Sequence, residues 1–262
     1  MHRYTSIEDL KEGFILKGLR VKQTHWQSVK SPDDTFELSP VIFEYPIPDE
    51  PFELAGLKPQ LPWAEDHFNE RINGMPLNPG NQYKNWRFYK HKPSDDKFRD
   101  SNQQFSHSYM ERFWPKFAGR FDDTLLIERQ QSDDHGFITP NMGIRYNLGD
   151  LEDVIDLLRR DPTTRQAYLP VWFPEDTGNV MNERVPCTLG YHFYVVRGKL
   201  HCHYYIRSCD FLRHFRDDVY LASRLTQHIA FKAVLDIGIL YMHITSLHVF
   251  YNERGLLRQR NT

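Results

Sequence analysis

The chain has 262 residues, of which 40% are hydrophobic and 14% aromatic, so it can build a sizeable core and does not have a disordered composition. Its formal net charge of −2 excludes a strong overall attraction to nucleic acid or to an anionic membrane. We therefore predict one large domain over residues 1–262, in which local residues meet any charged substrate.

The first residues contain no apolar segment typical of a signal peptide. The longest apolar stretch, residues 229–244, carries Lys232 and Asp236, so we expect no membrane span. Three cysteines without a paired framework favour a reducing compartment. We expect a cytoplasmic protein, in a bacterium or a phage-infected host.

Residues 73–143 form a polar insertion rich in Asn, Pro and aromatic residues, which predicts loops and a small subdomain. The alternative is a disordered insertion. Its density of aromatic side chains argues for packing; these are Trp86, Phe88, Tyr89, Phe105, Phe113 and Trp114.

A helix is predicted after Asp150, which can cap it, and Pro162 ends it. Its apolar face is Leu151, Val154, Ile155 and Leu158, and Arg159 and Arg160 suit its C-terminal end.

The rest of the chain predicts a sheet with one buried helix. Residues 167–173 are typical of a strand, and 187–196 and 200–207 of a hairpin of two long strands. Leu221, Leu225 and Ile229 recur at helical spacing, and 238–250 is a further strand. The predicted fold class is α+β, with a helical layer on a mixed sheet.

The thiols differ in their surroundings. Cys202 alternates with His201 and His203 in a strand and is predicted to be a small buried hydrophobe. The two histidines share a strand face, but no third metal ligand presents itself, so we predict no metal site. Cys187 follows Pro186 at a strand entry. If Arg207 and Arg165 lie near it, the two cations favour the nucleophilic thiolate.

Residues 161–250 resemble the thymidylate synthase superfamily. "DPTTRQ" (161–166) is similar to its phosphate loop DPDSRR, "VPCTLGYHFYVVRGKLHCHYYIRSCD" (185–210) to its nucleophile strand and hairpin, and "LHVF" (247–250) to its His-x-Tyr. The resemblance implies a sandwich fold and a symmetric homodimer formed through the sheets. It also implies that Arg165 serves the neighbouring subunit's site.

Shorter matches lie upstream. "KSPDDTFE" resembles the N-terminal phosphate loop, with Lys30 as the cation, and "PWAEDHFNER" the helix of the catalytic glutamate, here Glu65. "RFWPKFA" resembles the segment whose tryptophan touches the folate, here Trp114, and "GIRYN" the loop of an active-site tyrosine, here Tyr146. Each of the four has a structural alternative, as a solvated charge or a packed aromatic.

The family chemistry implies the remaining roles. The Cys187 thiolate adds to carbon 6 of a pyrimidine nucleoside monophosphate, and carbon 5 then attacks the methylene of 5,10-methylenetetrahydrofolate. Arg207 and Ser208 bind the phosphate, with Ser208 also close to the sugar. His248 binds substrate and Asp210 faces the pterin.

Asp218 stands where thymidylate synthases have asparagine. A carboxylate accepts from the exocyclic amine of cytosine, whereas it cannot donate to a uracil carbonyl. "HFRDDVY" and "SLHVF" also resemble phage deoxycytidylate hydroxymethylases. The alternative is that Asp217 or Asp218 only caps the following helix.

Three features depart from the family pattern. Gln166 replaces the second arginine of the phosphate pair, and Phe250 replaces the tyrosine expected on the sugar hydroxyl. The chain ends soon after "NERG" without a long tail, so we expect the insertion to cover the site.

These features predict a hydroxymethyltransferase that converts dCMP to 5-hydroxymethyl-dCMP. The alternatives are CMP hydroxymethylation, dTMP synthesis from dUMP, and a non-catalytic nucleotide-binding relative. We expect no nucleic-acid or membrane partner.

Overall fold

The computed structural model describes residues 2–22, 25–26, 29–30, 34–85, 103–116, 149–178 and 185–258. Its strands are β1 (His2–Tyr4), β2 (Leu19–Val21), β3 (His25–Trp26), β4 (Val29–Lys30), β5 (Thr35–Leu38), β6 (Val41–Pro46), β7 (Tyr168–Pro170), β8 (Thr188–Val196), β9 (Lys199–Asp210) and β10 (Asp236–Phe250). The helices are α1 (Ile7–Lys17), α2 (Trp63–Ile72), α3 (Tyr109–Phe113), α5 (Leu151–Arg160), α6 (Pro174–Gly178) and α7 (Phe215–Ala233), with 3-10 turns η1 (Pro51–Leu57), η2 (Asn81–Asn85) and η4 (Tyr251–Arg258). The predicted α+β class is confirmed.

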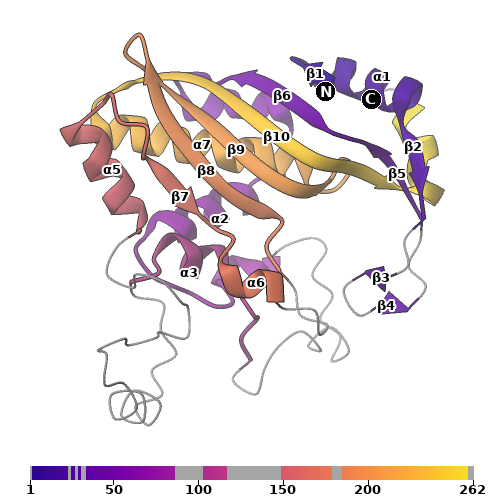
Figure 1. Cartoon of the computed structure of the whole chain (residues 1–262), viewed down its shortest axis with the longest axis horizontal. Coiled ribbons are helices and arrows are strands. Elements are labelled where there is room, and N and C mark those ends of the chain that lie inside the picture. The colour runs from indigo at the N-terminus through magenta and orange to yellow at the C-terminus, as the bar shows by residue number, and fades with distance from the viewer. Residues whose placement is uncertain are drawn as a thin grey trace.

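Eight strands form one mixed sheet, and β3 and β4 form a separate pair. The sheet runs in the order β1-β6-β10-β9-β8-β7, and β5 joins β10 to β2. β8 and β9 are the predicted hairpin, paired antiparallel through a turn in which Arg197 and Gly198 both have positive φ. β9 and β10 are parallel because α7 connects them (Figure 1).

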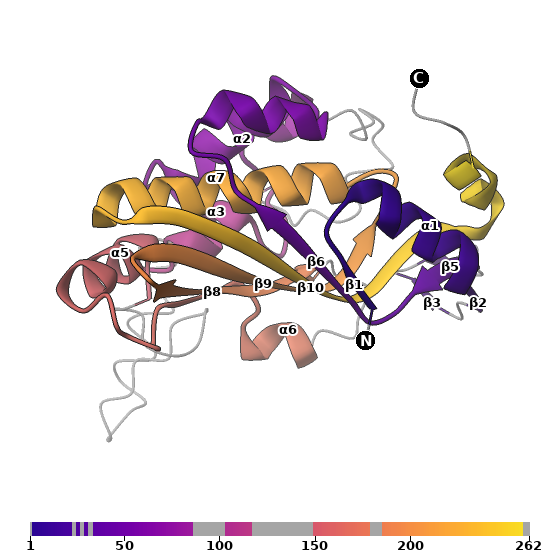
Figure 2. The ribbon, with the colours of Figure 1, turned by 90° about the horizontal axis from the view of Figure 1, so that it is seen from above.

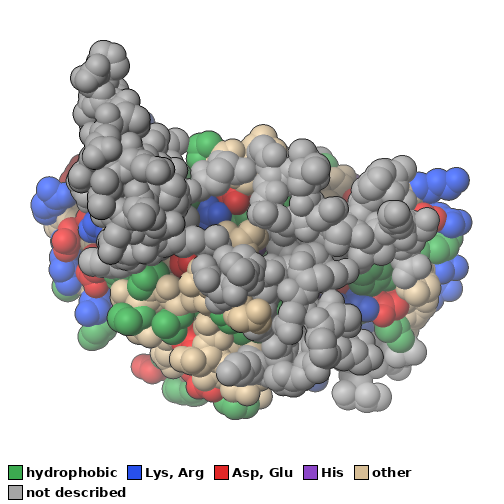
Figure 3. All heavy atoms as spheres, turned by 90° about the horizontal axis from the view of Figure 1, so that it is seen from below, with side chains coloured by type: hydrophobic (Ala, Val, Ile, Leu, Met, Phe, Trp, Pro, Cys, Tyr) green, Lys and Arg blue, Asp and Glu red, His purple; other side chains and the backbone are tan. Residues whose placement is uncertain are grey.

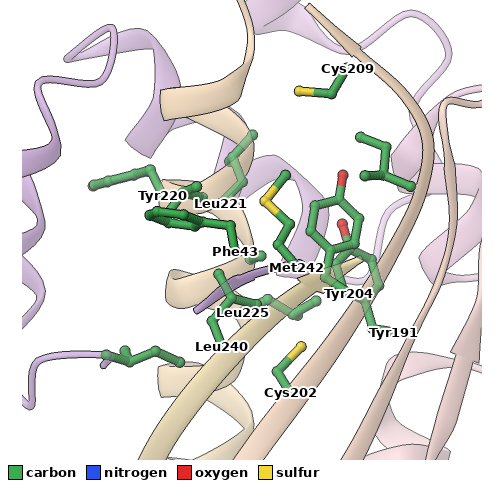
Figure 4. Close-up of a cluster of buried hydrophobic side chains, with 14 of the residues drawn as sticks. Phe43, Tyr191, Cys202, Tyr204, Cys209, Tyr220, Leu221, Leu225, Leu240 and Met242 are labelled. Carbon is green, nitrogen blue, oxygen red and sulfur yellow. The ribbon is translucent and has the colours of Figure 1, made fainter. Parts of the chain in front are cut away.

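Helix α7 covers one face of the sheet, and α2 packs on α7 at the same side (Figure 2). The predicted residues Leu221, Leu225 and Ile229 are buried between α7 and the sheet. Figure 4 shows this cluster, in which Cys202 lies against Leu225 and Leu240, so Cys202 is the core residue that alternation predicted.

Helix α5 confirms the capping prediction. Asp150 is its N-cap, and the Asp153 carboxylate accepts from the Asp150 N–H at 2.9 Å. Its apolar face is fully buried, and the helix ends at Arg160, just before the Asp161-Pro162 pair. β7 is shorter than predicted, ending at Pro170.

The insertion is partly described, as residues 73–85 and 103–116. Phe105, Phe113 and Trp114 are buried there, and the Trp114 Nε1–H donates to the Arg71 carbonyl at 2.7 Å. This part of the insertion therefore packs onto α2, as its aromatic content predicts. Trp86, Phe88 and Tyr89 lie outside the described residues.

The face of the sheet opposite α7 carries stacked polar rings. His203 Nδ1 and His243 Nε2 are 2.8 Å apart, and Tyr205 stacks on His243 with ring centroids 4.8 Å apart. Other members of this face are His192, Tyr194, His201 and Tyr241. Within the described ranges, no three His, Cys, Asp or Glu side chains are placed to hold a metal ion.

Charged side chains of both signs are interspersed on the described surface in Figure 3, in keeping with the small net charge. Among the described helices, none is long and apolar enough to span a membrane.

Candidate active site at the entry of strand β8

Cys187 lies immediately before β8 and is half-buried. Its carbonyl accepts from the Arg207 N–H at 2.9 Å. The Arg207 side chain turns to the same segment, donating from Nε to the Pro186 carbonyl at 2.9 Å and from a terminal nitrogen to the Val185 carbonyl at 3.2 Å. The structure thus brings the guanidinium beside the backbone that carries the thiol, as predicted.

A β-bulge follows directly, because the register with β9 shifts between Thr188 and Gly190. Bulges re-aim side chains and are common beside active sites. Here the bulge ends regular pairing next to Cys187.

A chain of hydroxyl groups starts one residue after the thiol. Thr188 Oγ1 lies 2.8 Å from the Tyr204 hydroxyl and 3.1 Å from the Tyr109 hydroxyl. Burial raises the pKa of Tyr109 to about 12, so its phenol remains protonated at neutral pH. In Figure 4 the hydroxyls of Tyr204 and Tyr191 point toward the end of the cluster where Cys209 lies.

Asp218 lies in the first turn of α7. The Cys209 thiol donates to its Oδ2 at 3.5 Å. Burial raises the pKa of Asp218 to about 7, while the charge of Arg71 and the Cys209 hydrogen bond act to lower it. The residue as a whole is partly exposed, but its carboxyl group is buried.

The helix-cap alternative is wrong, because the N-cap of α7 is His214. The neighbouring Asp217 is engaged elsewhere: it accepts from the Gln60 N–H at 2.7 Å and from the Gln60 side-chain amide at 2.5 Å. Of the two adjacent carboxylates, Asp218 is therefore the one that bonds the Cys209 thiol.

Two side chains of α2 that sequence reasoning missed complete this region. Arg71 is 7% exposed, and its guanidinium carbon lies 4.2 Å from the centre of the Tyr109 ring. His67, one turn earlier, stacks on Trp63, and burial together with the Arg71 charge holds the pKa of His67 well below its usual range. Their spacing of four residues places both on one helix face, which is the only signal that the sequence offered.

Glu65 lies on α2 and bonds two side chains of α7. Its carboxylate accepts from the Tyr220 hydroxyl at 2.7 Å and forms a bidentate pair with Arg224, at 2.9 and 2.8 Å. The Arg224 hydrogen bond is the main cause that lowers the pKa of Glu65. Tyr220 and Arg224 follow Asp217 at helical spacing, so Glu65 binds the Asp217 side of α7, and its catalytic role stays a prediction.

At the end of β9, the charge of Asp210 is balanced by nearby donors. Asp210 accepts from the Leu212 and Arg213 N–H groups at 3.0 and 3.1 Å, and the Arg213 guanidinium bonds it at 2.7 Å. That guanidinium also lies 4.6 Å from the centre of the Phe250 ring. The pterin role of Asp210 stays a prediction.

His248 and Ser208 lie on neighbouring strands. His248 is opposite Asp210 in the β9–β10 ladder, and Ser208 is opposite Ser246. Burial lowers the pKa of His248, although the charges of Asp210 and Glu37 oppose this. His248 is thus a neutral, buried ring near neutral pH.

Arg165 has no described contact with the Cys187 segment, and its role in the neighbouring subunit's site stays a prediction. Its carbonyl accepts from His192 Nε2 at 3.1 Å, and its side chain is exposed. His192 lies four residues along β8 from Thr188, which is about 13 Å at the usual strand rise.

The remaining expectations are only partly described. Trp114 is 4% exposed and packed on α2, so its folate contact stays a prediction. Lys30 lies in β4, but its side chain is outside the described atoms, and Tyr146 lies outside the described residues.

Comparison with known proteins identifies a family for this chain. The family model described as thymidylate synthase matches residues 80–260. A bifunctional dihydrofolate reductase-thymidylate synthase of Paramecium tetraurelia is 26% identical over 152 residues, which cover 53% of this chain and 32% of that protein. The thymidylate synthase of Listeria monocytogenes is 30% identical over 106 residues, covering 40% of this chain and 33% of that enzyme.

The matched regions thus span about a third of each relative. The family match itself covers more than half of the present chain and includes β8, β9, α7 and β10. The chain therefore belongs to the thymidylate synthase family.

Proposed function

We propose that this protein is a folate-dependent one-carbon transferase that converts dCMP to 5-hydroxymethyl-dCMP. The observation that supports this choice best is Asp218, a carboxyl group at the position where thymidylate synthases carry an amide. Its carboxyl group accepts from the Cys209 thiol and is not used as a helix cap. A carboxylate there accepts from the cytosine amine, whereas a uracil carbonyl would leave it unpaired at a cost of about 1–3 kcal/mol.

In this proposal Cys187 attacks carbon 6 of the cytosine ring, forming an S–C bond and moving the ring electron pair to carbon 5. The nearby Arg207 guanidinium favours the thiolate and binds the 5′-phosphate with donors that do not bond the backbone. After carbon 5 has bonded the one-carbon unit, its proton is lost to solvent. In the last step the C5–C6 double bond re-forms as the S–C6 bond breaks, and the electron pair of that bond returns to the thiolate.

5,10-Methylenetetrahydrofolate would supply the one-carbon unit. The α2 side of the site fits a polar heterocycle, because two buried nitrogens, His67 Nδ1 and Arg71 Nε, have no hydrogen-bond partner in the structure. Trp63, stacked on His67, offers an aromatic ring beside them. Water then provides the hydroxyl oxygen of the product.

We also propose that the protein works as a homodimer whose sheets pack through the face opposite α7. That face presents stacked rings, including Tyr168, which is 42% exposed. The exposed Arg165 contacts His192, which lies about 13 Å along β8 from Thr188. Arg165 therefore suits the neighbouring subunit's site better than the site of its own subunit.

Product analysis tests the proposal. Incubation of dCMP with methylenetetrahydrofolate in ¹⁸O-labelled water should give 5-hydroxymethyl-dCMP that carries one labelled oxygen, with tetrahydrofolate as by-product. Dihydrofolate that forms in step with a methylated nucleotide would instead establish the thymidylate synthase alternative. Equal concentrations of dCMP and CMP in competition test the sugar, and a win for CMP would overturn the deoxy assignment, which depends on Ser208.

A further inference from the structure

Helix α3 of the insertion contacts the chain on both sides of Cys187. Upstream, the buried Arg112 guanidinium bonds the Asp176 carboxylate of α6 at 2.9 Å. Downstream, the Tyr109 hydroxyl lies 3.1 Å from Thr188 Oγ1, and Thr188 is the residue that follows Cys187. One short helix thus touches the chain before the nucleophile and directly after it.

The Thr188 hydroxyl is held by two phenols. Its side chain is fully buried, and its second partner is the Tyr204 hydroxyl on β9, at 2.8 Å. Tyr204 is stacked on Tyr191 with ring centroids 4.6 Å apart, so this end of the hydroxyl chain is anchored in the sheet. Because a β-branched side chain has few χ1 rotamers, holding the hydroxyl of Thr188 also holds its Cα.

Tyr109 is itself fixed in place, so it can act as the second support. Ser108 caps α3 with a capping box, in which the Ser108 hydroxyl accepts from the Glu111 N–H at 3.1 Å and the Glu111 carboxylate accepts from the Ser108 N–H at 2.9 Å. The Arg71 guanidinium carbon also lies 4.2 Å from the centre of the Tyr109 ring. The phenol is therefore in position before any ligand binds.

The pairing of β8 with β9 leaves a part for these side-chain bonds. The register shifts between Thr188 and Gly190, so regular pairing is interrupted directly after Thr188. Before Thr188, the carbonyls of residues 185–187 accept from Arg207. The bonds of the Thr188 hydroxyl therefore add to the Arg207 contacts in setting where Cys187 lies.

We propose that Tyr109 is a positioning residue for the nucleophile Cys187, on which it acts through Thr188. Its hydrogen bond holds the entry of β8, so the Cys187 backbone stays beside the Arg207 guanidinium. The proposal rests on the proposed function, because it takes Cys187 as the nucleophile. Tyr109→Phe keeps the ring beside Arg71 and removes only the hydroxyl, so this variant isolates the role.

The first test needs no substrate. Alkylation by iodoacetamide at several pH values, followed by peptide mass spectrometry, reports the thiolate of Cys187, because the other two cysteines are buried. Tyr109→Phe and Thr188→Val should each raise the pH midpoint of this reaction by about one unit, since the thiol then moves away from the Arg207 cation.

Two variants control this measurement. Thr226→Val removes an equally buried threonine hydroxyl, which donates to the Ala222 carbonyl at 2.8 Å within α7, so it should lower the melting temperature and leave the midpoint unchanged. Thr188→Ser keeps the hydroxyl and should keep the wild-type midpoint. A merely structural role would instead lower the melting temperature in Tyr109→Phe with no change in the midpoint.

The second test measures turnover of dCMP. Tyr109→Phe should lower kcat by about tenfold and leave KM within about twofold of the wild-type value, because a displaced thiol affects the bond to carbon 6 more than it affects nucleotide binding. Thr226→Val should leave both constants unchanged.

The outcomes separate the two proposals. An unchanged midpoint in both Tyr109→Phe and Thr188→Val overturns the positioning role, whatever the substrate is. A shifted midpoint with an unchanged kcat overturns it as well, since the thiol would then have moved without effect on the reaction. If the wild-type protein turns over neither dCMP nor dUMP, the proposed function falls, and a shifted midpoint still supports the positioning of the thiol.

Discussion

Helix α2 meets α7 in two contrasting ways. On one side Glu65, Tyr220 and Arg224 form a closed set in which the carboxylate is bonded three times. On the other side Arg71 and Asp218 are both largely buried, yet no hydrogen bond joins them. The first set joins two helices. The second leaves donors and an acceptor for a ligand, so it is the better place to look for recognition.

The adjacent carboxylates on α7 repeat the contrast. Asp217 is satisfied by Gln60, whereas Asp218 has a thiol as its hydrogen-bond donor and a pKa raised to about 7. One residue along a helix turns a side chain by about 100°, enough to move it from a helix junction into the site.

The largest expected effect is at the thiol. Cys187→Ala should abolish turnover while nucleotide binding persists, because the alanine cannot form the bond to carbon 6. Mass spectrometry of the product and calorimetric binding measure the two quantities. Cys202→Ala is the control, since that thiol lies in the core and should affect stability alone. Wild-type turnover in Cys187→Ala would remove this residue from the mechanism.

The next effect separates the two aspartates. Asp218→Asn should shift the ratio of kcat/KM for dCMP over dUMP toward dUMP by roughly 10- to 100-fold, because the amide supplies the donor that a uracil carbonyl needs.

Asp217→Asn is its matched partner. It should leave the ratio unchanged and lower the free energy of unfolding by about 1–2 kcal/mol, through the lost contact with the Gln60 amide. Equal effects on the ratio from both variants would contradict the contrast between the two positions.

A smaller effect appears in the pH profile. Below about pH 7 Asp218 takes up a proton and can no longer act purely as an acceptor, so kcat/KM for dCMP should fall by about tenfold per pH unit. Asp218→Asn should lack this limb. Its persistence in that variant would assign it to another group.

Asp218 also makes the stability of the fold depend on pH, but in the opposite direction to kcat/KM. The folded-state pKa of Asp218 lies above its unfolded value, so the folded protein binds more protons between about pH 4 and pH 7. The free energy of unfolding of the wild type, relative to Asp218→Asn, should therefore decrease as the pH rises through this window. Denaturant titrations at several pH values measure it, and an increase would contradict the raised pKa.

The smallest effect belongs to the paired side of α2. Arg224→Met should lower the free energy of unfolding by about 1 kcal/mol or less, as for other partly exposed ion pairs. Glu65→Gln should match it, and a double-mutant cycle gives the coupling. A much larger loss of kcat in Glu65→Gln than in Arg224→Met would support the catalytic role that the resemblance gives to Glu65.

The sheet and its central helix were predictable because their patterns are strong. Alternation identifies the β8–β9 hairpin, and helical spacing identifies α7. The contact between Arg207 and the Cys187 segment followed from the hairpin, since both residues lie at its open end.

The other half of the site was not predictable in the same way. Arg71 and Tyr109 come from a polar helix and a five-residue helix, whose sequences give no sign of which side chains face inward. The partner of Glu65 is 159 residues away in the chain, so local reasoning could not foresee that its carboxylate is engaged. The position of Arg165 relative to the thiol was likewise not predictable, because it depends on where β7 pairs along β8.

The most direct test of the central claim is tritium release from carbon 5 of labelled dCMP and dUMP by the wild-type protein, with and without methylenetetrahydrofolate. If Asp218 binds the cytosine base, tritium release from dCMP should depend on the folate and exceed tritium release from dUMP at equal concentration. Faster release from dUMP would contradict the claim.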